Sequence, residues 1–297
     1  MHSDPTLADG YKMIIAPVSD LLDGETEIMI VPDPLLVKVP FEALQDKDGS
    51  YLSETFRIRI VPSLTTLNLI HNSPADYHSQ TGALMVGDPD VGWVLYKGSK
   101  VYRSSLPFAR EEARMLGRIL GAQTLVGNEA TKQAVLDSIH SMSLVHLAAH
   151  GNAKTGEIYL ARPLSADETP QEEDYLLTIA DISKVRLRAR LVVLSCCHSA
   201  DGEIRAEGVV GMARAFLGSG ARSVLAARWA VDDEATMHFM FRFYYHLVRG
   251  ESASESLHKT MKWMRAGPFS KVQQWAPFML IGDNVTFNFD KKRYAFI

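Results

Sequence analysis

The sequence predicts an α/β fold: a mostly parallel sheet with helices on both faces, preceded by a small β-rich N-terminal lobe. From residue 81 onward, short runs of uninterrupted apolar residues alternate with helix-like segments. Such runs are typical of parallel strands that are buried on both faces. Before residue 80, strand-like runs follow one another without an intervening helix. We therefore expect an accessory lobe at residues 1–80 and a larger core at residues 81–297.

The N-terminal lobe is expected to hold three short strands. The strand-like runs lie at residues 27–31, 36–39 and 56–61, and turn-forming residues such as Pro32-Asp33 separate them. Runs this close together, with turn chemistry between them, predict an antiparallel or mixed meander.

The core is expected to alternate strands with helices. The predicted strands lie at residues 83–87, 123–127, 144–149, 191–195, 223–229 and 277–282. The predicted helices lie at residues 108–120, 130–139, 209–218, 234–248 and 252–265. In the helix at 234–248, four apolar residues recur at helical spacing and predict its buried face. They are Met237, Phe241, Tyr244 and Val248.

The net charge and the cysteine content limit the main partner and the cellular compartment that are expected for this protein. The net charge is 31 − 35 = −4, which argues against a nucleic acid or a membrane surface as the main partner. No signal peptide is visible, and no apolar run approaches the ~18 residues that a membrane span needs. The two cysteines, Cys196 and Cys197, are adjacent, a poor geometry for a bridge between them. This usage indicates a reducing compartment, so we expect a soluble, cytoplasmic protein.

Two predicted strands end in side chains that suit nucleophilic catalysis. One ends at His150 and Gly151, and the other at Cys196, Cys197 and His198. In open α/β sheets, ligands bind at the carboxyl ends of the strands, where these residues are expected to meet. A cysteine thiolate is a strong nucleophile, and an imidazole beside it can take its proton. The backbone N–H of Gly151 is accessible enough to serve in an oxyanion hole.

These residues also allow two other interpretations. A cysteine at the end of an apolar strand is most often a buried core residue. A metal site at His146 and His150, with the Cys-Cys-His run nearby, is disfavoured by strand geometry. Four strand residues separate the two histidines by roughly 13 Å, whereas zinc holds each ligand at about 2 Å. His146 is therefore expected to be a core histidine, and neither a metal nor a cofactor motif is predicted.

Two segments of the sequence resemble the His-Gly and Cys signatures of a known family, HLAAHG and LVVLSCCHS. That family is the CHAT domain, a caspase-like module that is similar to separase and is often attached to tetratricopeptide repeats. The resemblance continues upstream and downstream through VPDPLLVKVPFEAL, RIVPSLTTL, MVGDPD, LPFAREEARML, the long run from Glu207 to Gly250, and WAPFMLIG. It therefore covers nearly the whole chain.

The resemblance implies a caspase-like core and a role for each residue of the motif. Cys197 takes the position of the nucleophile and His150 that of the general base, while Cys196 falls on the family's alanine. The N–H groups of Gly151 and Cys197 would form the oxyanion hole, with no metal or organic cofactor. After the nucleophile the family commonly has an acidic or polar residue and then Thr-Gly, whereas this chain has His198-Ser199-Ala200.

The function expected from this resemblance is that of a cysteine endopeptidase. Asp232 and Asp233 follow a predicted strand and are the candidate substrate-binding residues, for a basic side chain before the cleaved bond. Capping of the next helix is the competing role for this acidic pair, and Arg228 is a candidate to neutralise it. Two other functions stay open: a catalytically silent interaction module of a tetratricopeptide-repeat protein, and a small-molecule binder. The natural substrate, the need for an activator and the oligomeric state are not predicted.

Overall fold

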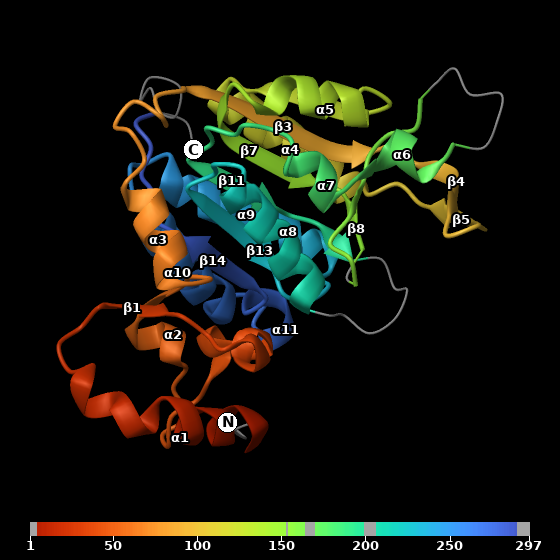
Figure 1. The fold of residues 1–297 in the computed structure, drawn as a ribbon. Coiled ribbons are helices and arrows are strands. Elements are labelled where there is room, and N and C mark those ends of the chain that lie inside the picture. The colour runs from red at the N-terminus through yellow and green to blue at the C-terminus, as the bar shows by residue number, and fades with distance from the viewer. Residues whose placement is uncertain (1–4, 153, 164–169, 199–205, 290–297) are drawn as a thin grey trace.

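An eight-stranded sheet runs through the centre of the molecule in this computed structural model (Figure 1). The structure describes residues 5–152, 154–163, 170–198 and 206–289, with the backbone alone for residues 5, 34, 197, 198 and 206–209. In spatial order the strands are β1 (Glu27–Ile30), β2 (Arg57–Ile60), β14 (Phe278–Gly282), β13 (Ser223–Ala227), β11 (Leu191–Leu194), β7 (Met142–Ala148), β3 (Gly82–Pro89) and β6 (Gln123–Gly127).

All neighbouring strands of this sheet are parallel except one pair. The exception is β13 with β14, which are antiparallel. The strands β13, β11, β7, β3 and β6 therefore run in one direction, and β14, β2 and β1 run in the other. This arrangement confirms the predicted mostly parallel α/β sheet.

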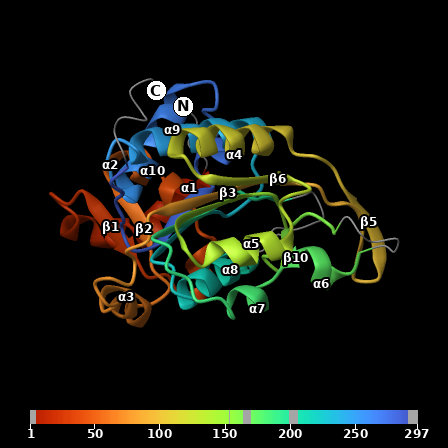
Figure 2. The same ribbon diagram turned by 90° about the horizontal axis from the view of Figure 1, so that it is seen from above.

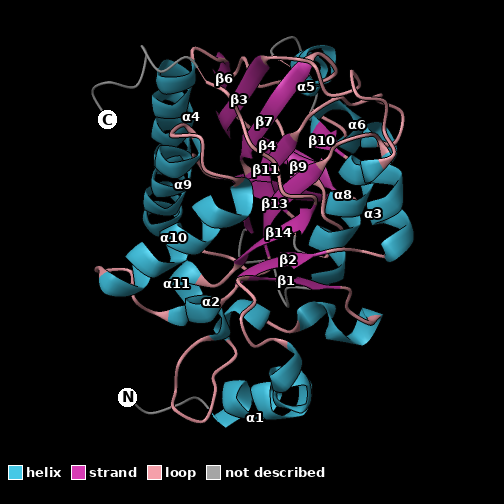
Figure 3. Cartoon of the chain, turned by 90° about the vertical axis from the view of Figure 1, so that its left-hand side faces the viewer, coloured by secondary structure: helices cyan, strands magenta, loops and turns pink. Residues whose placement is uncertain are grey.

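Helices cover both faces of the sheet (Figures 2 and 3). One face carries α4 (Pro107–Leu120), α9 (Asp233–Leu247), α10 (Ala253–Ala266) and α11 (Val272–Trp275). The other carries α3 (Leu64–His71), α5 (Lys132–Ile139), α7 (Ile179–Ile182) and α8 (Ala206–Gly218). The central strands are apolar throughout because alternate residues pack on opposite layers: Val192 belongs to the core under α8, and Val193 to the core under α9.

A second, four-stranded sheet lies beyond the end of β7. Its order is β10 (Leu176–Leu177), β9 (Ile158–Tyr159), β8 (His150–Gly151) and β12 (Cys197–His198). The short helix α6 (Glu172–Tyr175) precedes β10, and a separate hairpin is formed by β4 (Gly92–Tyr96) and β5 (Ser99–Arg103).

The N-terminal strands differ from the prediction. Residues 36–39 do not form a strand, because Pro34–Lys38 is a 3-10 helix whose first N–H groups include one bonded to the Asp33 carboxylate. The remaining strands β1 and β2 are parallel and extend the main sheet, so the expected meander is wrong. The other helical segments before residue 60 are α1 (Pro5–Ile14), η1 (Ala16–Leu21), η3 (Phe41–Ala43) and α2 (Leu52–Thr55). The lobe boundary near residue 80 stays a prediction.

The buried face of α9 was predicted only in part. Tyr244 and Val248 are buried, but Met237 and Phe241 are only half-buried. The face that packs on the sheet is offset from the predicted one, and its large apolar members are Phe239, Met240, Phe243, Tyr244 and Leu247.

A buried ion pair joins the N-terminal segment to the end of β13. The guanidinium of Arg228 donates to both carboxylate oxygens of Glu42, and the two residues are 3% and 1% exposed. Each charge is removed from water and depends on the other for compensation. The pair therefore fixes η3 against the strand that leads to the acidic residues of the candidate site.

Replacing one partner of this pair should destabilise the chain strongly. We expect Glu42→Ala to lower the free energy of unfolding by about 3–5 kcal/mol, because Arg228 is left as an uncompensated buried charge. Urea unfolding followed by circular dichroism measures the change. The matched control is Glu111→Ala, which breaks the exposed pair with Arg118 at a cost of about 0–1 kcal/mol. Equal, small effects of the two substitutions would contradict this role for the pair.

Candidate active site

Three central strands end at the same edge of the sheet. β7, β11 and β13 are parallel and paired in the order β13–β11–β7. His150 and Gly151 follow β7, Cys196 and Cys197 follow β11, and the acidic pair follows β13. The topology therefore places all the predicted site residues beyond one edge.

The two predicted catalytic positions lie directly beside each other. β8 and β12 are parallel, with Cys197 paired to His150 and His198 paired to Gly151. This pairing places the backbone of residue 197 directly beside that of residue 150 in the small sheet. The departure from the family pattern continues at Ser199 and Ala200, which lie outside the described residues.

The imidazole of His150 is held in one tautomer. Its Nε2 lies 2.7 Å from the carbonyl oxygen of Ser104. Because a carbonyl can only accept, the proton of the neutral ring is on Nε2. Nδ1 is then an acceptor, and this buried atom has no hydrogen-bond partner among the described residues. The ring thus presents one unoccupied basic nitrogen.

Burial also keeps this imidazole neutral. His150 is 6% exposed. Desolvation lowers the pKa of His150 below its ordinary value, and the nearby charge of Arg103 acts in the same direction. The Ser104 hydrogen bond and the Asp88 carboxylate raise the pKa and oppose this shift without cancelling it. A neutral imidazole is the form that can accept a proton.

Ser104 and Asp88 were not predicted as site residues. Ser104 contributes only a backbone carbonyl, a group that every residue has, so the residue type at this position does not indicate the role. Asp88 follows an apolar strand in the Gly87-Asp88-Pro89 run, and its carboxylate accepts hydrogen bonds from the Ser105 hydroxyl and the Leu106 N–H. A carboxylate at the carboxyl end of a core strand was the available signal.

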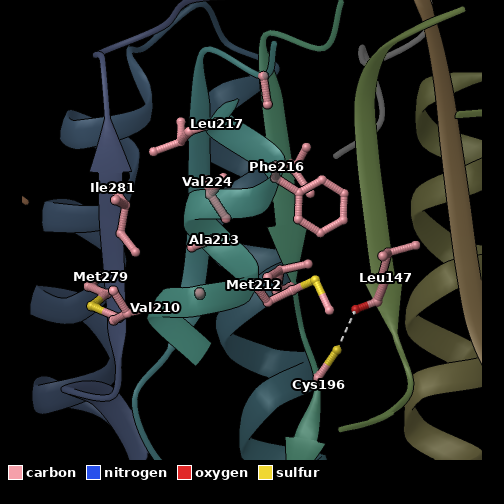
Figure 4. Close-up of a cluster of buried hydrophobic side chains, with 14 of the residues drawn as sticks. Leu147, Cys196, Val210, Met212, Ala213, Phe216, Leu217, Val224, Met279 and Ile281 are labelled. Atoms are coloured by element: carbon pink, nitrogen blue, oxygen red, sulfur yellow. Dashed lines mark hydrogen bonds between the residues drawn. The ribbon is translucent and has the colours of Figure 1, made fainter. Parts of the chain in front are cut away.

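Cys196 is a core residue rather than a reactive thiol. Its Sγ lies 3.6 Å from the carbonyl oxygen of Leu147, as Figure 4 shows, and it belongs to the buried cluster that contains Met212 and Phe216. Burial raises the pKa of the Cys196 thiol to about 12. A thiol that stays protonated at neutral pH is a poor nucleophile.

His146 occupies the core, as the strand geometry predicts. Its Nε2 lies 2.7 Å from the Glu112 carboxylate and its Nδ1 lies 3.2 Å from the Tyr244 hydroxyl, so both nitrogens are satisfied. Within the described ranges, no group of three or more His, Cys, Asp or Glu side chains is arranged to hold a metal ion. None of the described helices has the length and apolarity that a membrane span requires.

The acidic pair makes the contacts of helix capping. Asp232 is the N-cap of α9, and its Oδ1 accepts the Ala235 N–H at 3.1 Å. Asp233 accepts the Phe108 N–H at 3.3 Å and so connects the first turns of α9 and α4. Arg228 does not neutralise this pair, because it is bonded to Glu42. The substrate-binding role of the two carboxylates stays a prediction.

The fold and the paired His and Cys positions define a caspase-like α/β domain. The CHAT domain model matches residues 5–283. The chain therefore belongs to the CHAT domain family, as its sequence motifs imply.

Relatives and solved structures agree with this assignment. The chain is 29% identical to human tetratricopeptide repeat protein 28 and 31% identical to the mouse protein, in each case over 96% of this chain. It spans only 13% of the length of these relatives. The separase of a Saccharomyces cerevisiae separase–securin complex has a similar fold (TM-score 0.54, 18% identity, 87% of this chain and 15% of that one). The Arg-specific cysteine proteinase gingipain R of Porphyromonas gingivalis also has a similar fold (TM-score 0.57, 11% identity, 95% of this chain and 68% of that one).

The buried neutral state of His150 should appear in the pH dependence of stability. The unfolded chain protonates this histidine near its ordinary pKa of about 6.5, whereas the native chain does so only at lower pH. The unfolded state therefore binds more protons in that window. This part of the stability is complete above about pH 6.5 and is lost as the pH falls toward the native pKa.

We expect His150→Gln to flatten the acid limb of the stability curve. Below about pH 6.5, the slope of unfolding free energy against pH should decrease by up to ~1.4 kcal/mol per pH unit. Urea unfolding at a series of pH values measures both slopes. Carboxylates contribute equally to the two proteins, so identical slopes would show that His150 is not held neutral by the fold.

Proposed function

We propose that this chain is a cysteine endopeptidase domain in which Cys197 is the nucleophile and His150 the general base. One observation carries the proposal: the backbone register pairs Cys197 directly with His150, whose buried Nδ1 has no hydrogen-bond partner among the described residues. A neutral imidazole with its other nitrogen bonded to a carbonyl is the form that accepts a thiol proton. His146, four residues earlier, has no such free nitrogen.

The reaction follows from this arrangement. Cys197 transfers its proton to Nδ1 of His150, and the thiolate forms a bond with the scissile carbonyl carbon. The N–H groups of Gly151 and Cys197 stabilise the oxyanion. The tetrahedral species collapses when the C–N bond breaks and the imidazolium donates its proton to the leaving amine. Water then hydrolyses the thioester, with His150 again as the base.

The Ser104 carbonyl has a defined part in these steps. It holds the Nε2–H bond throughout, so the ring does not rotate when Nδ1 gains and loses a proton. When the ring is positively charged, the same bond becomes charge-assisted and stabilises the imidazolium. Family membership and the fold shared with separase and gingipain R support a peptidase, although a fold by itself does not fix function.

The second candidate is a catalytically silent interaction module. It is favoured by one observation: the relatives are tetratricopeptide repeat proteins of which this chain matches only 13%. Whether the domain is a peptidase or an interaction module, we propose that such repeats are attached to it or regulate it. The reactivity of Cys197 toward a mild alkylating reagent over a pH series separates the two functions, because only a catalytic pair depresses the pKa of the thiol.

The nucleophile can be identified by paired substitutions. We expect Cys197→Ala and His150→Ala to abolish cleavage in a peptide-library digest read by mass spectrometry, with both variants folded. Cys196→Ala should keep activity and lose stability, because it removes a buried side chain that is bonded to Leu147. A dead Cys196→Ala beside an active Cys197→Ala would reverse the assignment. A largely active His150→Ala would point to His198 as the base.

We propose a preference for arginine before the cleaved bond, with lysine second. Asp232 and Asp233 follow β13 at the catalytic edge, and a carboxylate pairs with the planar guanidinium more effectively than with an ammonium group. One neighbour in fold, gingipain R, is described as Arg-specific. This supports the proposal at the level of fold only.

Single substitutions in the first turn of α9 test this preference. We expect Asp233→Ala to reduce kcat/KM for an arginine substrate about tenfold, equal to about 1.4 kcal/mol of transition-state binding. Glu234→Ala is the matched control, since this exposed carboxylate lies in the same turn. Cleavage concentrated after aspartate or apolar residues would contradict the preference and leave the Cys-His mechanism intact.

A further inference from the structure

Asp88 is a buried carboxylate with an unusual backbone. It is 2% exposed, and its φ of 46° lies in the left-handed region that side chains other than glycine rarely adopt. The β3–β6 register shifts between Gly87 and Pro89, which marks an irregularity at this residue. Strain of this kind and the burial of a charge both cost free energy, and such strain clusters at functional sites.

The carboxylate of Asp88 fixes the segment that enters α4. Its Oδ1 accepts the Leu106 N–H at 2.6 Å, and its Oδ2 accepts the Ser105 hydroxyl at 2.8 Å. Arg110 donates to the same Oδ2 from Nε at 2.8 Å, with Nη2 at 2.7 Å. The charge of Asp88 is thus compensated, and two consecutive residues after Ser104 are bound to it.

These bonds determine where the Ser104 carbonyl points. The C=O of Ser104 and the N–H of Ser105 belong to one planar peptide group. Holding the side chain of Ser105 and the N–H of Leu106 therefore fixes the orientation of that plane. The Ser104 carbonyl in turn accepts the Nε2–H of His150. Hydrogen bonds at each end, joined by the covalent backbone of residues 104–106, thus connect Asp88 to the imidazole.

We propose that Asp88 is a positioning residue for His150, which acts through the Ser104–Ser105 peptide to hold the imidazole in the tautomer and orientation that a base requires. The effect of Asp88 on catalysis rests on the proposed function, whereas its effect on the orientation of the imidazole does not. It assigns a role to a residue that takes no part in the bond-making and bond-breaking steps of the proposed mechanism.

Capping of α4 alone does not account for these contacts. Three other helices are each capped by a single local hydroxyl: Ser63 caps α3, Thr131 caps α5 and Ser252 caps α10. Asp88 lies 18 residues from Leu106 in sequence and is both buried and strained. It also binds the Ser105 hydroxyl, which precedes the helix. A cap needs none of these features.

The test compares Asp88→Asn and Asp88→Ala with Glu42→Gln in the full chain. Glu42 is the matched control because its carboxylate is also buried and is bonded to a different arginine, Arg228. Two readouts are needed: exchange of the His150 Nε2–H proton with water, followed by NMR of the imidazole nitrogens, and the pH profile of Cys197 alkylation by iodoacetamide. Ser105→Ala is a milder variant that removes one bond and preserves the charge pair.

We expect the Asp88 variants to accelerate proton exchange at His150 and to slow alkylation near neutral pH, each about tenfold or more. The alkylation profile should move toward the range of an ordinary thiol, about pH 8.5. Ser105→Ala should change both readouts in the same direction by a smaller factor. Glu42→Gln should lower stability and change neither readout. If Asp88→Asn does not fold, the Ser105→Ala result decides.

The inference is overturned if the folded Asp88 and Ser105 variants lose stability while exchange at His150 keeps its wild-type rate. Asp88 would then be only a cap of α4. A wild-type Cys197 with ordinary thiol reactivity would instead refute the proposed function. In that case the exchange measurement still decides the role of Asp88, so the two failures are distinguishable.

Discussion

The register of β7 against β11 is the constraint on which the candidate site depends. Leu144 pairs with Leu191, and the same offset of 47 residues continues past the strand ends, where His150 pairs with Cys197. The apolar side chains of both strands pack on two helical layers, so a slip by one residue would turn every side chain to the wrong face. The hydrophobic core therefore specifies which cysteine lies beside the histidine. The pairing of His150 with Cys197 is a consequence of core packing rather than of local contacts at the edge.

The same strand segment shows how a polar group becomes either structural or reactive. His146 is satisfied on both nitrogens by Glu112 and Tyr244, from the helices that cover that face. His150 lies beyond the helical layers, where a single backbone carbonyl occupies one nitrogen. The cysteines differ as well: Cys196 lies in the core, where burial raises the pKa of its thiol, while the backbone of Cys197 pairs with that of His150. Reactive His and Cys side chains are therefore predicted beyond the strand ends, where helices no longer pack on the sheet.

The sequence predicts those parts of the molecule that depend on local patterns. The uninterrupted apolar runs gave the parallel core, and His150 and Cys197 were placed at strand ends by the same runs. Residues 36–39 were wrongly predicted as a strand because Asp33 and Pro34 start a 3-10 helix within an apolar stretch. The pair of Glu42 with Arg228 joins positions 186 residues apart and has no local signal. The Ser104 carbonyl is equally invisible, because every residue has one. Its importance arises only from the fold that brings it to His150.

The first turn of α4 connects the base to the candidate specificity residues. Asp88 binds the N–H of Leu106 just before this helix, and Asp233 binds the N–H of Phe108 within it. Both carboxylates thus accept backbone N–H groups at the positive end of the helix, where the first N–H groups have no partner within the helix. A guanidinium at Asp233 would compete with Phe108 for that carboxylate, whereas Asp88 has its own arginine, Arg110. Substrate binding at Asp233 would therefore perturb the same turn whose entry is fixed by Asp88. If Asp233 binds a basic side chain as proposed, its recognition would be coupled to the orientation of the Ser104 carbonyl, and through it to His150.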